Sequence, residues 1–238
     1  MNQPNRLVDC PKGHATSPFT LGRGPQRSRK MSLGPKLPGK VLISACALLI
    51  SAFTGISANA ASQPFSLSSP DLVSGKFSQK FLLNGFGCKG SNLSPALEWS
   101  NVPVGTKSLS IQLQDIDAPT GSGIWHWAVY NIPPTVSELV QGTGNSLNKL
   151  PKLAIGGNTD FVDTGVTNGN GNYAGPCPPV GDKPHRYVFT IYALAVENVE
   201  AAAGIPVTGT PALHSFVFNK GLGDKLLGKA RFTALYGQ

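Results

Sequence analysis

The chain has 238 residues, which is enough for one large domain or two small ones. Its 28 glycines and 20 prolines, with only 13% charged residues, favour short strands and turns over long helices. The net charge of +8 lies mostly at the amino terminus, because residues 1–60 carry eight basic side chains and one acidic side chain. Residues 61–238 are nearly neutral, which argues against a nucleic-acid-binding domain with basic residues on its fold.

The first 60 residues have the pattern of an export signal. Residues 1–30 are polar and basic with no apolar period, so we expect no fold there. After Met31, two lysines precede an apolar stretch over residues 41–53, and Ala58-Asn59-Ala60 is a small-x-small cleavage site. This order predicts a secretory signal peptide over residues 31–60, cleaved after Ala60. The apolar run is short for a membrane span, so the membrane is expected to be contacted only through the removed signal.

Two points about this region stay open. Either residues 1–30 are an unusually long basic extension, or translation starts at Met31. The segment Ile43-Ser44-Ala45-Cys46 is similar to a lipoprotein cleavage box, but most of the apolar core follows Cys46. Cleavage after Ala60 is therefore favoured over lipidation. In either case the protein is predicted to be exported, to a periplasm or to the medium.

The rest of the chain has the pattern of a single β domain, residues 61–238. Apolar, aromatic and β-branched residues predict strands over residues 77–83, 97–99, 108–115, 125–132, 187–194 and 231–236. The clearest alternation places Leu109, Ile111 and Leu113 on one face. Helices are expected only over residues 196–203 and 215–229. Residues 139–157 read as a loop, and residues 159–173 have no regular pattern. The fold class is mainly β and antiparallel.

Two cysteines, Cys88 and Cys177, remain after signal cleavage, and both lie in glycine-containing loops. In an exported chain a disulfide between them is plausible, whereas a reducing compartment would leave two free thiols. Such a long closed loop would contribute about 4–5 kcal/mol to stability by the chain-entropy argument.

Polar residues gather where the predicted strands end. Asp115 and Asp117 end one strand, His126 begins the next, and the stiff loop 175–184 leads into residues 185–187. Because strand ends in a β domain can meet at one rim, these groups could form a single site. The alternative is that each is structural, with Asp115 capping a turn and His126 satisfied in the core.

Three chemistries suit two carboxylates and two histidines. A metal site is the first, although the spacing matches no known metal motif. Acid–base hydrolysis is the second, although the chain has no Gly-x-Ser-x-Gly elbow. Anion binding is the third: histidines, hydroxyls and loop N–H groups hold phosphates, and a buried carboxylate nearby is expected to raise a histidine's pKa.

Four motifs occur in order along the chain: Asp115-x-Asp117-Ala118-Pro119, Trp125-His126-Trp127, Gly175-Pro176-x-Pro178-Pro179 and His185-Arg186-Tyr187. This series resembles the phosphatidylethanolamine-binding protein (PEBP) family, in particular its bacterial Raf kinase inhibitor-like branch, over roughly residues 65–238. The resemblance implies a large central antiparallel sheet packed with a smaller sheet, few short helices and a small anion pocket. The implied ligand-binding residues are Asp115, Asp117, Pro119, His126, Gly175, Pro176, His185 and Tyr187.

The resemblance also implies an ion pair between Arg186 and Asp117, and the chain departs from the family pattern at two places. Ile116 stands between the aspartates where the family usually has proline, which loosens the expected turn. Residues 219–225 lack the histidine often found before the last strand.

We therefore predict an exported, non-enzymatic protein that binds phosphate or a phosphorylated small molecule or lipid headgroup, with no metal, cofactor or nucleic acid. The alternative is a regulator whose partner is another protein, such as a kinase or protease. A weak hydrolase built on the Asp/His cluster is less favoured.

Overall fold

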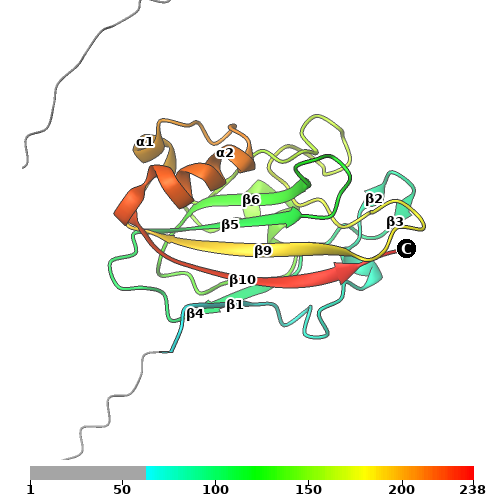
Figure 1. The fold of residues 1–238 in the computed structure, drawn as a ribbon, viewed down its shortest axis with the longest axis horizontal. Helices are drawn as coiled ribbons and strands as arrows, with labels where there is room; N and C mark the ends of the chain where they lie inside the picture. Colours follow the sequence, from blue (N-terminus) through cyan, green and yellow to red (C-terminus); the bar gives the residue numbers. More distant parts are fainter. Residues whose placement is uncertain (1–62) are drawn as a thin grey trace, which may run out of the picture. The chain divides into compact units, whose positions relative to one another are not determined.

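A five-stranded antiparallel sheet forms the centre of the computed structural model, which describes residues 63–238 (Figure 1). The predicted extension, residues 1–30, and the predicted signal peptide, residues 31–60, lie outside the described residues. The order of the strands across the sheet is β10-β9-β5-β6-β8. Their bounds are β5 Ser108–Asp115, β6 Ile124–Ile132, β8 Ile155–Gly156, β9 His185–Leu194 and β10 Leu226–Tyr236.

Alternation in the sequence explains why β5 lies at the centre of this sheet. Leu109, Ile111 and Leu113 are fully buried on the face predicted to be apolar. The other face is buried as well, because the second helix covers it: the Gln112 side chain donates a hydrogen bond to the Pro211 carbonyl at 3.0 Å. A strand buried on both faces holds its ends firmly, which matters for the site at its carboxyl end.

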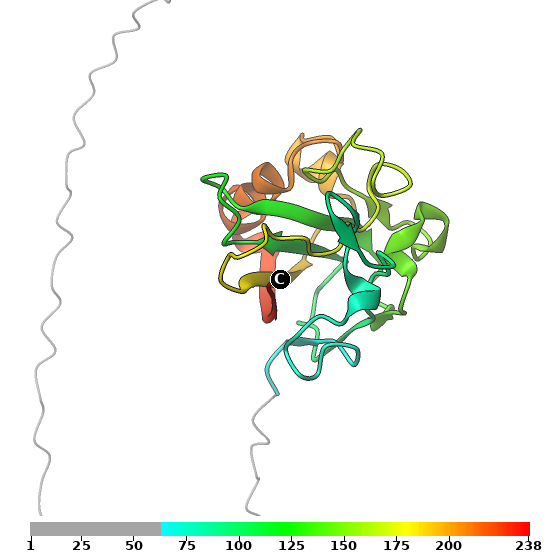
Figure 2. The ribbon, with the colours of Figure 1, turned by 90° about the vertical axis from the view of Figure 1, so that its right-hand side faces the viewer.

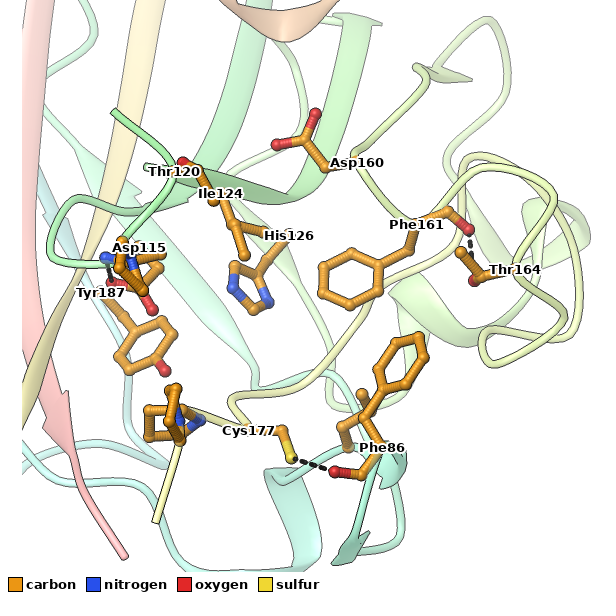
Figure 3. Close-up of a pocket in the computed structure, with 15 residues that line it drawn as sticks. Phe86, Asp115, Thr120, Ile124, His126, Asp160, Phe161, Thr164, Cys177 and Tyr187 are labelled. Atoms are coloured by element: carbon orange, nitrogen blue, oxygen red, sulfur yellow. Dashed lines mark hydrogen bonds between the residues drawn. The ribbon is translucent and has the colours of Figure 1, made fainter. Parts of the chain in front are cut away.

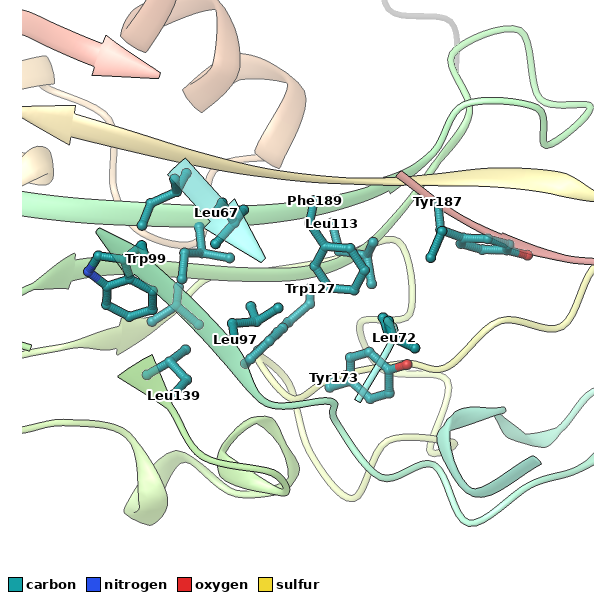
Figure 4. Close-up of a cluster of buried hydrophobic side chains, with 14 of the residues drawn as sticks. Leu67, Leu72, Leu97, Trp99, Leu113, Trp127, Leu139, Tyr173, Tyr187 and Phe189 are labelled. Atoms are coloured by element: carbon teal, nitrogen blue, oxygen red, sulfur yellow. The ribbon is translucent and has the colours of Figure 1, made fainter. Parts of the chain in front are cut away.

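A smaller antiparallel sheet packs on the first face and closes the core. Its order is β1-β4-β7, with bounds β1 Ser66–Ser68, β4 Leu97–Ser100 and β7 Glu138–Leu139. Its inward side chains Leu67, Leu97 and Trp99 join the same buried cluster as Trp127 and Phe189 of the large sheet (Figure 4). The predicted arrangement of a large sheet packed with a smaller one is therefore confirmed. A separate hairpin is formed by β2 Asn84–Gly85 and β3 Cys88–Lys89.

Two short α-helices, α1 Val199–Ala203 and α2 Pro211–Phe216, lie near the end of the sheet opposite the β2–β3 hairpin (Figure 1). Each begins at a side-chain cap, because Asn198 accepts from the Ala201 N–H and Thr210 accepts from the Leu213 N–H. A π-helical turn and a 3-10 turn continue α2 over Val217–Gly221 and Gly223–Lys225. Phe218 of this region packs on Tyr130 and Tyr192 of the sheet.

Three expectations from the sequence were wrong. Residues 77–83 form no strand but a 3-10 turn at Gln79–Phe81, in which the Phe81 N–H donates to the Ser78 carbonyl at 3.0 Å and the Leu82 N–H to the Gln79 carbonyl at 3.2 Å. The helical region expected over residues 215–229 starts earlier, at Pro211, and gives way to β10 at Leu226, after Gly223 adopts a φ of +57°. Residues 139–157 contain short strands and 3-10 turns at Thr143–Asn145 and Leu147–Lys149 as well as loops.

Candidate ligand-binding site

A cavity of about 370 Å³ opens at the end of the large sheet where β5 finishes. The antiparallel register brings three strand ends together there, because Asp115 of β5 pairs with Ile124 of β6 on one side and with Tyr187 of β9 on the other. Loops from this end complete the walls, and the same end faces the viewer in Figure 2. The cavity is lined by Leu83, Phe86, Asp115, Ala118, Pro119, Thr120, Ile124, His126, Asp160, Phe161, Thr164, Cys177, Pro178, Pro179 and Tyr187 (Figure 3).

The structure places the eight predicted site residues in two groups. Asp115, Pro119, His126 and Tyr187 line the cavity. The remaining four lie next to the site but outside its lining: Asp117, Gly175, Pro176 and His185. The contacts of each group show what its members do.

Asp115 is a structural carboxylate at the junction of the strands. Its Oδ1 accepts hydrogen bonds from the N–H groups of Asp117 and Ala118, at 3.0 and 3.1 Å. Its Oδ2 lies 2.8 Å from Nδ1 of His185, and both side chains are buried. The second ring nitrogen of His185 lies 3.3 Å from Oδ2 of Asp182. Both partners of His185 are therefore carboxylates of the protein.

The implied ion pair between Arg186 and Asp117 is present. Arg186 donates from Nε and Nη2 to the two carboxylate oxygens at 2.9 and 2.7 Å, and its N–H donates to Oδ2 at 2.8 Å. These hydrogen bonds hold the pKa of Asp117 well below its usual range. Ile116, where the family usually has proline, donates its N–H to the Arg186 carbonyl at 3.1 Å. Since proline has no N–H, this departure adds a backbone bond to the turn.

Gly175 and Pro176 hold the loop against residues 81–83. The Gly175 N–H donates to Oδ1 of Asn92 at 2.7 Å, and the Pro176 carbonyl accepts from the Leu83 N–H at 3.2 Å. A Cβ at Gly175 would lie 2.2 Å from the carbonyl oxygen of Phe81. Glycine is thus required here for a close approach of two backbones.

His126 is 3% exposed, and its ring lies between those of Phe161 and Tyr187, at centroid distances of 5.0 and 5.3 Å (Figure 3). Nδ1 lies 3.0 Å from the Ala174 carbonyl oxygen, whereas Nε2 is buried without a hydrogen-bond partner among the described residues. Burial lowers the pKa of His126, and the opposing effects of the Ala174 carbonyl, Asp115 and Asp160 are smaller. The nearby carboxylates do raise the pKa of His126, as expected, but desolvation outweighs their charge, so the net change in this pKa is downward.

The Tyr187 hydroxyl is the second buried polar group of the cavity that lacks a hydrogen-bond partner within residues 63–238. Burial and the charge of Asp115 raise its pKa, so the phenol keeps its proton and can donate.

The sequence did not reveal the apolar walls, Phe86 and Phe161. Both lie in segments with no regular pattern, and the only signal was an aromatic residue between two glycines, Gly85 and Gly87. Phe86 is 66% exposed at the tip of the hairpin, with its ring 6.3 Å from that of Phe161. The hairpin is joined to the cavity wall by the disulfide between Cys88 and Cys177.

Two further findings concern the described part of the chain. Residues 63–238 contain no group of three or more His, Cys, Asp or Glu side chains arranged to hold a metal ion. Within the same residues, none of the helices has the length and apolar character needed to cross a bilayer.

Replacing Gly175 with alanine tests whether this residue is structural. We expect Gly175→Ala to lower the free energy of unfolding by about 1–3 kcal/mol or more, because the new Cβ would meet backbone atoms. Urea denaturation measures the change. Gly221→Ala is the control, since its Cβ would lie at ordinary contact distances of 3.4–3.6 Å from Val217. Equal stability of the two variants would contradict the structural role.

Stability should also depend on pH through His126. Its pKa is lower in the folded protein than the usual value of about 6.5, so the unfolded chain takes up the proton first as the pH falls. The free energy of unfolding is therefore unaffected by the titration of this histidine above pH 6.5. Below pH 6.5 it falls, by up to about 1.4 kcal/mol per pH unit for one histidine. Buried His214 acts in the same direction.

The measurement is urea unfolding between pH 7.5 and 5, with His126→Gln and His214→Gln tested separately. Each variant should remove part of the slope. A slope unchanged in His126→Gln would show that burial does not keep this ring neutral.

Comparison with known proteins identifies the family of this chain. The family model described as phosphatidylethanolamine-binding protein matches residues 73–236. Protein YbcL of Escherichia coli K12 is 45% identical over 150 residues, which cover 62% of this chain and 77% of YbcL. Protein YbhB of the same organism is 42% identical over 153 residues, which cover 63% of this chain and 92% of YbhB.

The crystal structure of E. coli YbcL, a member of the mammalian PEBP family, gives a TM-score of 0.62 at 38% identity, over 74% of this chain and 99% of YbcL. The sequence match and the shared fold lead to one conclusion: this chain belongs to the phosphatidylethanolamine-binding protein family.

Proposed function

We propose that this protein binds phosphate, free or as part of a phosphorylated small molecule or lipid headgroup, in the cavity at the end of β5. One observation carries the proposal: the Tyr187 hydroxyl and His126 Nε2 are buried in the cavity wall, and neither has a hydrogen-bond partner among the described residues. An unsatisfied buried polar group costs about 1–3 kcal/mol. A ligand that hydrogen-bonds to both groups would recover that cost.

The Asp115 carboxylate and the threonine hydroxyls of the wall already have partners within the protein. Both oxygens of Asp115 have partners, and the hydroxyls of Thr120 and Thr164 donate to the carbonyls of Gly123 and Phe161. The rest of the lining is largely apolar, as in most small-molecule sites. The phosphate would thus meet Tyr187 and His126, while the organic part of an ester would contact Phe86 and Phe161.

The name of the family suggests phosphoethanolamine as a ligand with a cationic group. Asp160 offers that cation a partner at the exposed side of the cavity lining. Its Oδ2 accepts a hydrogen bond from the Trp125 N–H at 2.8 Å, and its Oδ1 has no hydrogen bond in the described part of the chain. The ammonium group of phosphoethanolamine would pair with this carboxylate.

Binding without catalysis fits the contacts better than hydrolysis. A nucleophilic enzyme needs a hydroxyl or thiol hydrogen-bonded to its base. No described side chain hydrogen-bonds to His126 Nε2, and both ring nitrogens of His185 face carboxylates. Neither histidine is arranged to activate a nucleophile of the protein.

Calorimetric titration with inorganic phosphate and phosphoethanolamine tests the proposal, with Tyr187→Phe as the variant. Loss of the hydroxyl should weaken both ligands about tenfold or more, because hydrogen bonds to charged groups contribute about 1.5–3 kcal/mol. The melting temperature should not fall, since the hydroxyl has no internal partner within residues 63–238.

Tyr192→Phe is the matched control, because this tyrosine of β9 packs in the cluster under the helices. Asp160→Asn keeps an acceptor for Trp125 and should weaken phosphoethanolamine only. Absence of saturable binding in the unmodified protein would rule out a phosphate site and favour a protein partner.

We also propose that the protein is exported and that its signal is removed after Ala60. The signal-peptide pattern of residues 31–60 supports this proposal, and a disulfide such as Cys88–Cys177 is typical of an oxidising compartment. Amino-terminal sequencing of the exported protein should begin at Ala61. A first residue at Cys46 would show lipidation instead, and an intact amino terminus would exclude cleavage.

A further inference from the structure

The orientation of His126 determines which of its ring nitrogens carries the proton. The Ala174 carbonyl oxygen, 3.0 Å from Nδ1, can only accept a hydrogen bond, so Nδ1 must be the donor. A neutral imidazole has a single N–H. In the neutral ring Nε2 therefore carries a lone pair, has no partner among the described residues and acts as an acceptor.

A second proton on this ring is disfavoured by its surroundings. The charged or titratable groups that face it are Asp115 at the end of β5, Asp160 in the loop after β8 and Tyr187 on β9, and the Ala174 and Gly175 carbonyls lie on the remaining side. The carboxylates and carbonyls favour the charged ring, but burial of a side chain that is 3% exposed outweighs them and lowers the pKa of His126. The ring is neutral when the cavity is empty at neutral pH.

Tyr187 supplies a hydrogen-bond donor, whereas His126 supplies an acceptor. Its phenol keeps its proton and is a donor without a partner among the described residues. The empty cavity thus offers one buried donor and one buried acceptor. A ligand that satisfies both must itself carry an acceptor and a donor.

We propose that His126 selects phosphate species that carry a proton, because only a P–OH group can donate to Nε2 while a phosphate oxygen accepts from Tyr187. This inference rests on the proposed phosphate site and defines its ligand class. Inorganic phosphate keeps a P–OH at pH 8. A monoester keeps one only near or below its second pKa of about 6, whereas sulfate and phosphodiesters have none at neutral pH.

The class of ligand therefore follows from hydrogen-bond complementarity. An oxygen without a hydrogen would place its lone pairs against those of Nε2, and sites built around a buried polar group reject analogues that leave it unmatched. At neutral pH the favoured ligand is free phosphate, and small phosphomonoesters join it only near or below pH 6, where they keep a P–OH. A phosphodiester, the form found in a lipid headgroup, would need His126 to take up a proton.

The first experiment is calorimetric titration of the protein at pH 8 with inorganic phosphate, sulfate and glycerophosphoethanolamine, in two buffers of different ionisation enthalpy. We expect phosphate to bind without net proton uptake and the other two to bind on the order of 100-fold more weakly or worse. As the pH is lowered, sulfate should gain affinity, up to about tenfold per pH unit, with uptake of one proton.

Sulfate affinity within a few-fold of phosphate at pH 8 would overturn this inference and leave the proposed phosphate site intact. Proton uptake on binding phosphate at pH 8 would overturn it as well. Failure of phosphate to bind would instead remove the proposed function, and this inference with it.

A second readout does not depend on any ligand. Nitrogen-15 NMR of the ligand-free protein at pH 8 should show His126 protonated at Nδ1 and unprotonated at Nε2, and the opposite tautomer would contradict the proposal. In His126→Gln the side-chain amide can also donate, so the preference for phosphate over sulfate should shrink at least tenfold. His214→Gln is the matched control: His214 is also buried with Nδ1 facing a carbonyl, that of Thr210, but it belongs to α2 and stacks on Tyr130, and its loss should not change the preference.

Discussion

The end of the large sheet where β5 finishes depends on the hydrogen bonds of the Asp115 carboxylate. It closes the turn after β5 through two N–H groups and fixes the first residue of β9 through His185, while its backbone lies in register with β6 and β9. A buried carboxylate is stable only when its oxygens have partners. Because Asp115 uses its carboxylate oxygens to hold the turn after β5 and His185 of β9, it shapes the cavity wall but has little capacity left for a ligand.

The two histidines, His126 and His185, differ in how many of their ring nitrogens already have a partner within the protein. The motifs gave both the same role, yet His185 has both nitrogens against carboxylates and lies outside the cavity lining. His126 uses one nitrogen to hold the Ala174 carbonyl and leaves the other unsatisfied in the wall. The number of partners that each histidine already has distinguishes them, and His126, with an unmet hydrogen bond, is the one that the proposed function assigns to the ligand.

Much of the fold could be predicted because local patterns determined it. The alternation in residues 108–115 predicted β5, and glycine and proline marked both ends of β6 and the start of β9. The turn at Gln79–Phe81 could not be predicted, because Phe81 is buried through contacts with distant residues. For the site, the motifs located the strand ends. They did not show that Gly175 is needed for backbone packing, nor that Phe86 and Phe161 form the wall, because these roles depend on long-range contacts.

The disulfide explains how such irregular walls keep their shape. Pro178 and Pro179 line the cavity without N–H groups, so this loop cannot be held by a strand ladder on that side. The Cys88–Cys177 bond joins it to the β2–β3 hairpin across 89 residues of sequence. By lowering the conformational entropy of the unfolded chain, this bond contributes about 4–5 kcal/mol to the stability of the fold in the entropy model. Proline rings stiffen the loop locally, and the cross-link sets its distance from the Phe86 hairpin. A cavity held in this way would lose little conformational entropy on binding the proposed ligand, so under the proposed function its selectivity would be set by the hydrogen bonds of Tyr187 and His126.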